Sequence, residues 1–93
     1  MLILKIHAIK QMKKRKILLR EIQNVVSSGE IIEEYPDDEP YPSKLMFALC
    51  GNRPIHVVAA VHPKNPDDTF IISAYEPDRK KWDETFRKRL KRQ

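Results

Sequence analysis

The chain has 93 residues, of which 41% are hydrophobic and 33% charged, and its formal net charge is +5. This size and composition indicate one folded domain over residues 1–93 with a modest core, and they exclude an intrinsically disordered chain. A single cysteine excludes an internal disulfide framework, and the apolar start is too short for a signal peptide core or a membrane span. We therefore expect a cytoplasmic protein with no membrane contact.

Charge is segregated along the sequence. Residues 5–20 hold seven basic residues and no acid, residues 30–39 hold six acids and no base, and residues 79–92 hold eight basic residues and two acids. Basic clusters attract phosphate groups and acidic surfaces. The charge layout favours contact with a nucleic acid or an acidic protein, and the alternative is that the basic clusters serve solubility alone.

The first third of the chain predicts two helices. Residues 1–6 are compatible with either a short strand or a lead-in to a helix. Apolar residues then recur with the 3.6-residue period of a helix, first over residues 7–15 and again over residues 18–28. Gly29 follows as a helix stop, because glycine readily adopts the conformations that end a helix.

The middle of the chain predicts strands separated by turns that contain proline, glycine, asparagine and aspartate. Four apolar segments are long enough for strands, and they cover residues 30–35, 44–50, 55–62 and 69–75. Short strands that follow one another through turns favour an antiparallel meander. Val57 and Ala59 belong to an unbroken apolar parity, so we expect both to be buried.

The end of the chain predicts a third helix over residues 78–92. Asp78 is a good N-cap, and three apolar residues follow at a spacing of four, namely Trp82, Phe86 and Leu90. The expected fold is therefore α+β, with two N-terminal helices packed on a four-stranded antiparallel meander and a basic C-terminal helix.

One face of the first predicted helix carries residues suited to phosphodiester chemistry. His7, Gln11 and Arg15 are four residues apart, which places them on one ridge, with Lys14 close by. Histidine carries protons near neutral pH, and arginine binds phosphate through two donors. The alternatives are that His7 bonds only to its own helix and that Arg15 pairs with a nearby glutamate.

Two residues of the predicted sheet are further candidates. His56 lies on an apolar strand, where it is either a proton carrier or a core histidine that satisfies its own hydrogen bonds. Tyr75 ends the last strand, where it is a proton donor, a ring that stacks on a base or a packing residue. Because phenol is a weak acid at neutral pH, stacking is favoured over proton donation. The histidines and Cys50 lack the paired spacing of zinc ligands, and the chain has no glycine-rich phosphate loop, so we expect neither a metal nor a cofactor.

The order of these motifs resembles a family of small prokaryotic proteins known as domain of unknown function 4258. The resemblance covers roughly residues 7–82 and is carried by His7-Ala8, Met12, Arg15-x-Ile17, Val25-x-x-x-Gly29-Glu30-Ile31-Ile32, Tyr35, Pro54-Ile55-His56-Val57-Val58, Ile71-Ile72-x-x-Tyr75-x-Pro77 and Trp82. The chain departs from the family pattern at Gln11, where the family has arginine, and at Lys16, where it has glycine. The usual serine or threonine N-cap of the second helix is also replaced, by Leu18-Leu19. The family resembles the RelE-type toxins and microbial ribonucleases in fold.

The resemblance implies a metal-independent endoribonuclease toxin of a toxin–antitoxin pair, acting on RNA and neutralised by an acidic antitoxin. We expect four catalytic residues, namely His7, Arg15, His56 and Tyr75. We expect eight nucleic-acid-binding residues, namely Lys10, Gln11, Lys13, Lys14, Arg87, Lys88, Lys91 and Arg92. The alternative is a non-enzymatic module that binds RNA or an acidic protein, and the sequence leaves open whether the protein is a monomer or a homodimer.

Overall fold

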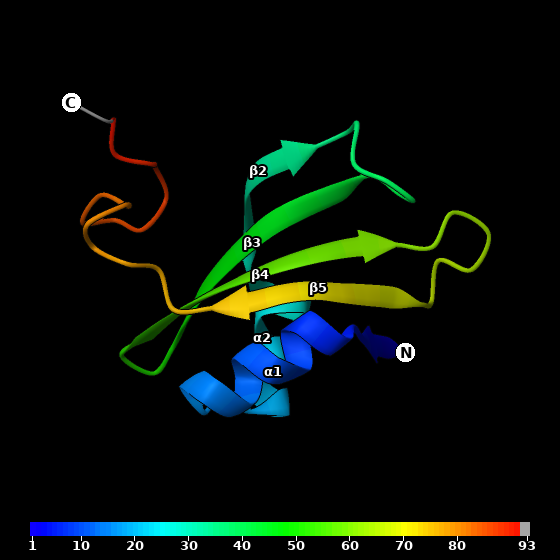
Figure 1. Ribbon diagram of the computed structural model, residues 1–93, viewed down its shortest axis with the longest axis horizontal. Helices are drawn as coiled ribbons and strands as arrows, with labels where there is room; N and C mark the ends of the chain where they lie inside the picture. The colour runs from blue at the N-terminus through cyan, green and yellow to red at the C-terminus, as the bar shows by residue number, and fades with distance from the viewer. Residues whose placement is uncertain (92–93) are drawn as a thin grey trace.

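The computed structural model describes residues 1–91 and consists of a five-stranded sheet with two helices packed on one face (Figure 1). No helix in this part of the chain has the length and apolar character needed to cross a membrane. In chain order the elements are β1 (Leu2–Leu4), α1 (Ile6–Arg15), α2 (Leu19–Ser28), β2 (Glu30–Tyr35), β3 (Ser43–Cys50), β4 (Arg53–Val61) and β5 (Thr69–Tyr75).

The sheet has the strand order β1-β5-β4-β3-β2, and only its last four strands form the antiparallel meander that the sequence predicts. β1 is parallel to β5, with Leu2 opposite Thr69 and Leu4 opposite Ile71. The expected four-stranded antiparallel sheet is therefore wrong, although the α+β class is right. A three-residue strand has too little pattern to be recognised, and nothing local indicates a partner almost seventy residues away.

The main core lies between the helices and the sheet. Ala8 of α1 and Ile22 of α2 belong to one buried cluster with Ile55 and Val57 of β4, and all four are fully buried. Ala59 is equally buried, so the burial predicted from the alternation of this strand is confirmed.

The end of α1 is fixed by a long-range contact. α1 stops at Lys16, whose φ of 56° is left-handed. Arg53 at the start of β4 donates to the carbonyl oxygens of Arg15 and Lys16, and it pairs with Glu21 of α2 at 3.1 Å. The half-buried Arg53 guanidinium thus joins the C-terminal end of α1, the first turn of α2 and the sheet.

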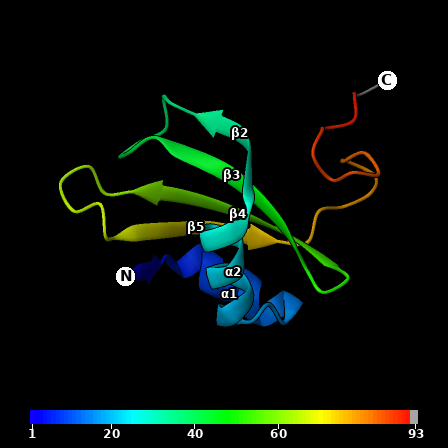
Figure 2. The same ribbon diagram turned by 180° about the vertical axis from the view of Figure 1, so that it is seen from behind.

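The segment after β5 is not the helix that the sequence predicts over residues 78–92. As far as residue 91 it forms turns and one isolated bridge between Trp82 and Arg89, on the face of the sheet opposite the helices (Figure 2). The Asp83 carboxylate accepts hydrogen bonds from the backbone and hydroxyl of Thr85, and such local bonds compete with a helix. Phe86 has a φ of 62°, which is incompatible with a right-handed helix.

Candidate functional site: a basic groove beside strand β5

The ridge predicted on α1 faces a depression between this helix and the end of β5. Three predicted catalytic residues and three predicted binding residues are near one another, because the depression is lined by His7, Lys10, Gln11, Lys14, Arg15 and Tyr75. Lys13, also predicted to bind RNA, is exposed on α1 but does not line it.

A second depression shares Arg15 and Tyr75 with the first and continues toward the C-terminal segment. Its other lining residues are Glu76, Asp78, Lys81, Trp82 and Arg89. We call the two depressions together the β5 groove. Arg89 was missed by the sequence analysis, because only the turn at residues 82–89 brings it back to the sheet.

Gln11 anchors α1 to the edge of β5. β1 pairs with β5 only as far as Ile71, so the edge beyond that residue has no neighbouring strand. The Gln11 side-chain oxygen accepts hydrogen bonds from the Ala74 amide at 2.9 Å and from the Ser73 hydroxyl at 3.0 Å. This bond fixes the central turn of α1, and His7 and Arg15 lie one turn to either side of it.

The Arg15 guanidinium is available for a ligand. Its side chain forms no salt bridge with any residue of the described part, 1–91. The two glutamates that could have paired with it have other partners: Glu21 pairs with Arg53 at 3.1 Å, and Glu30 pairs with Arg87 at 2.7 Å.

His56 does not line the groove but lies behind Tyr75. It is fully buried, and its ring centroid is 4.5 Å from that of Trp82. Its Nε2–H donates to the carbonyl oxygen of Phe86 at 2.8 Å, which leaves Nδ1 to accept the Tyr75 hydroxyl at 3.4 Å. Burial lowers the pKa of the imidazole, although the Phe86 carbonyl and the nearby Glu33 charge partly offset that effect.

Tyr75 connects the buried histidine with the groove. It is the cross-strand partner of His56, and it is partly exposed. Burial raises the pKa of its phenol to about 12, so the hydroxyl is protonated at neutral pH. In the groove Tyr75 therefore offers an aromatic ring and a neutral hydroxyl rather than a phenolate.

Arg89 is held by the other edge of the sheet. It forms a bidentate pair with Glu33, and its guanidinium carbon lies 4.6 Å from the centre of the Trp82 ring. Burial alone would raise the pKa of Glu33, but its hydrogen bonds to Arg89 and Tyr35 lower it. The pair keeps Trp82 over His56.

The remaining predicted nucleic-acid-binding residues are not one free basic surface. Arg87 pairs with Glu30 and lies 5.0 Å from the Phe47 ring centroid, whereas Lys88 and Lys91 are exposed. Arg92 lies outside the described residues. The structure therefore brings together three of the four predicted binding residues of α1 but not those of the C-terminal segment.

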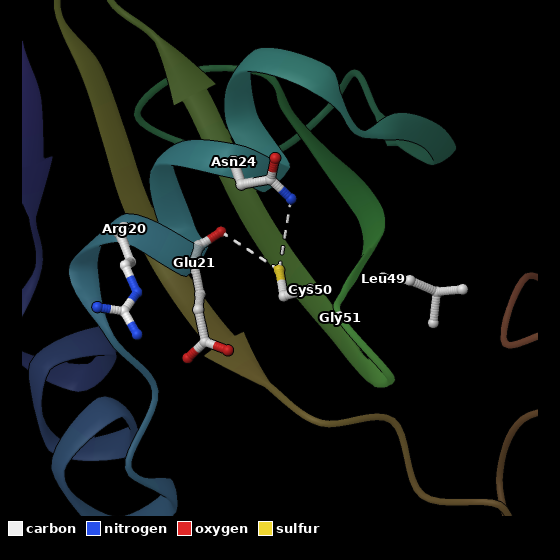
Figure 3. A pocket seen from close by; sticks show the side chains of 6 residues that line it. All are labelled: Arg20, Glu21, Asn24, Leu49, Cys50 and Gly51. Carbon is white, nitrogen blue, oxygen red and sulfur yellow. Dashed lines mark hydrogen bonds between the residues drawn. The ribbon is translucent and has the colours of Figure 1, made fainter.

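A further pocket lies at the turn between β3 and β4 and contains none of the predicted site residues (Figure 3). In it the Cys50 thiol accepts a hydrogen bond from the Asn24 amide at 3.5 Å and donates one to the Glu21 carbonyl at 3.8 Å. Within residues 1–91 no group of three histidine, cysteine or acidic side chains is arranged to hold a metal ion.

Comparison with known families gives one match. The profile of the family described as Domain of unknown function (DUF4258) matches residues 4–76, which is more than half of the chain. The chain belongs to this family. No curated protein and no solved structure matches the chain.

In this DUF4258 member the two parts of the β5 groove have different origins. His7, Arg15 and Tyr75 lie in the part that matches the family, as does the buried His56. Trp82 and Arg89 follow it. The part of the groove formed by α1 and β5 thus belongs to the family domain, and the C-terminal segment extends it.

Proposed function

We propose that this protein is an RNA-directed endoribonuclease that acts in the β5 groove. One observation carries the proposal: a single depression is lined by three candidate catalytic residues and two lysines, namely His7, Arg15, Tyr75, Lys10 and Lys14. Cleavage of RNA by internal attack needs a proton carrier and a cation beside the same phosphate. Of the residues that line the groove, His7 is the only histidine.

His7 and Arg15 divide the chemistry between them. The His7 imidazole accepts the proton of the ribose 2′-hydroxyl, whose oxygen attacks phosphorus while the bond to the 5′-oxygen breaks. The imidazolium returns the proton to this leaving oxygen, which gives a 2′,3′-cyclic phosphate and a 5′-hydroxyl. The Arg15 guanidinium binds the non-bridging oxygens through two donors and stabilises their developing charge. Cleavage should therefore persist in the presence of a chelator.

Tyr75 and His56 support this reaction rather than exchange protons with the substrate. The Tyr75 phenol stays neutral and is suited to stack on a base next to the cleaved phosphate. His56 holds the phenol in place from behind, through the contact between its Nδ1 and the Tyr75 hydroxyl. His56 is thus a positioning residue in the proposed site.

The biological role that we propose is that of the toxin in a toxin–antitoxin pair. The resemblance to RelE-type toxins supports this role. An acidic antitoxin would cover the β5 groove, because five cationic side chains line it: Lys10, Lys14, Arg15, Lys81 and Arg89.

A second candidate is a non-enzymatic module that binds RNA or an acidic protein. It is favoured by the burial of His56, which leaves His7 without a second proton carrier in the groove. Both candidates predict binding to the same groove, and only a chemical assay separates them.

The test compares Arg15→Ala with Arg20→Ala on a single-stranded RNA in the presence of a chelator. Both variants remove one exposed helical arginine, but only Arg15 lines the β5 groove. Loss of a donor to the transition state should lower the cleavage rate roughly 10²- to 10³-fold in Arg15→Ala. Equal rates in the two variants would rule out the proposed role of Arg15.

A further inference from the structure

Another depression, separate from the β5 groove, lies at the other end of β5 and reaches the residue before α1. It is mainly apolar and is lined by Lys5, Pro40, Tyr41, Ala60, Phe70 and Ile72. The Tyr41 and Phe70 rings are stacked at an angle of 16°, with their centroids 5.7 Å apart. We call this depression the aromatic pocket.

The tyrosine of the aromatic pocket is held by His62, which directly follows β4. The Tyr41 hydroxyl lies 3.4 Å from Nε2 of His62. Nδ1 of His62 accepts hydrogen bonds from the backbone amides of Lys64 and Asn65, which orders the loop after β4. Tyr41 is nevertheless only partly buried, so one edge of its ring remains accessible.

Among residues 1–91, the only charged group that lines the aromatic pocket is a cation. The Lys5 ammonium lies 5.2 Å from the centre of the Phe70 ring, at the residue that precedes α1. A flat apolar site with a cation at its rim fits a nucleobase that is joined to a phosphate.

The aromatic pocket and the β5 groove lie along the same two elements. Lys5 immediately precedes α1, and the groove is lined by the same helix from His7 to Arg15. Along β5, Phe70 and Tyr75 are separated by five residues, or roughly 16 Å. A stacked strand rises about 3.4 Å per nucleotide, so a strand of about five nucleotides reaches from one site to the other.

We infer that the aromatic pocket binds one unpaired base of the RNA strand whose phosphates occupy the β5 groove. The inference rests on the proposed function, because it takes the occupant of the groove to be RNA. The base inserts beside Tyr41 and Phe70, and Lys5 pairs with an adjacent phosphate. The substrate is accordingly a single-stranded segment, since a paired base could not reach the pocket.

The test uses a 2′-O-methyl RNA of about ten nucleotides, which binds but lacks the hydroxyl needed for internal attack. One nucleotide at a time is made abasic, and the affinity for the wild-type protein is measured. One abasic position, within about five nucleotides of the groove, should weaken binding roughly 5- to 150-fold.

The protein variants identify the pocket as the site of that base. Tyr41→Ala should lower the affinity for the intact RNA by the same factor. In this variant the abasic position should lower the affinity no further, because both changes remove the same contact. Tyr41→Phe keeps the ring and loses the hydroxyl, so it should bind as the wild type does and serves as the control for folding.

The outcomes separate the inference from the proposed function. If Tyr41→Ala binds every RNA as the wild type does while Lys14→Ala binds more weakly, the aromatic pocket takes no base and the groove alone holds the strand. If no RNA binds, both are wrong. If the RNA binds as expected but unmodified RNA is not cleaved, the base site stands and only the proposed chemistry fails.

Discussion

At the scale of single residues, the contacts of the buried His56 link two parts of the fold. His56 accepts the Tyr75 hydroxyl, donates to the Phe86 carbonyl and packs against Trp82. Its ring therefore joins the sheet to the segment that covers it. The sequence left open whether His56 is a core histidine or a proton carrier, and its complete burial favours the core role.

His56 should make the stability of the protein depend on pH. Because burial lowers the folded-state pKa below its ordinary value of 6.5, the unfolded chain takes up the proton first as the pH falls. The free energy of unfolding should be highest above about pH 7.5 and should decrease below pH 6.5 by at most about 1.4 kcal/mol per unit. The decrease should stop once the pH is below the lowered folded-state pKa.

Urea unfolding between pH 5 and 8 measures this dependence. The titratable side chains that face His56 are Tyr75, Glu33 and Arg89. Because the pKa of Glu33 is lowered, the free energy of unfolding also changes at more acidic pH, where this carboxylate takes up a proton. His56→Gln stays neutral throughout and should lose the part of the slope that is due to this residue. Identical slopes in the wild type and the variant would show that His56 is not buried as a neutral group.

At the scale of elements, the sequence predicts which residues share one face of α1, but it does not predict the hydrogen bond that holds this helix to β5. The i, i+4 spacing is sufficient to place His7, Gln11 and Arg15 on one side of the helix. The spacing cannot show that Gln11 accepts a hydrogen bond from the Ala74 amide. That bond forms because β1 ends at the level of Ile71 and leaves the rest of the β5 edge without a strand. An arginine at this position could not accept that hydrogen bond, because its side chain is a donor only.

The end of α1 gives a prediction for Lys16. Lys16 has a left-handed φ of 56°, where glycine is preferred over a residue with a side chain. Lys16→Gly should raise the free energy of unfolding by about 0.5–1 kcal/mol, whereas the control Lys13→Gly, inside α1, should lower it by about 1 kcal/mol. Chemical denaturation measures both, and a destabilised Lys16→Gly variant would contradict the assigned conformation.

The C-terminal segment shows where sequence patterns fail. The four-residue spacing of Trp82, Phe86 and Leu90 indicated a helix, yet the first two rings pack on the sheet from a turn and Leu90 is 48% exposed. The pattern carried no information about the local bonds of Asp83 or about tertiary contacts. The strands of the meander were predictable because each is bounded by turn residues, whereas β1 has no such boundary and pairs with the far end of the chain.

At the scale of the whole molecule, the acidic middle of the sequence pairs with two arginines of the basic C-terminal segment. Glu30 and Glu33 of β2 pair with Arg87 and Arg89, whereas the basic residues of α1 remain beside the groove. Attraction of a polyanion should therefore depend more on α1 than on the C-terminal segment. This order is the reverse of what the charge count of the two segments indicates.

The salt dependence of RNA binding tests this distribution. Replacing Lys10 and Lys14 by alanine should flatten the slope of log affinity against log salt by about 1.4, since each lost phosphate contact removes roughly 0.7 on a single strand. The control replaces Lys88 and Lys91, which changes the net charge equally and should leave the slope almost unchanged. An equal change in the two double variants would place the C-terminal lysines in the binding site.

The most direct test of the β5 groove as a ribonuclease site is the activity of His7→Ala on RNA. His7 is exposed, so the variant should melt at the temperature of the wild type. In the presence of a chelator the wild type should release products ending in a 2′,3′-cyclic phosphate, and the variant should do so roughly 10²- to 10⁴-fold more slowly. Full activity in His7→Ala, or a wild type that cleaves no RNA, would contradict it.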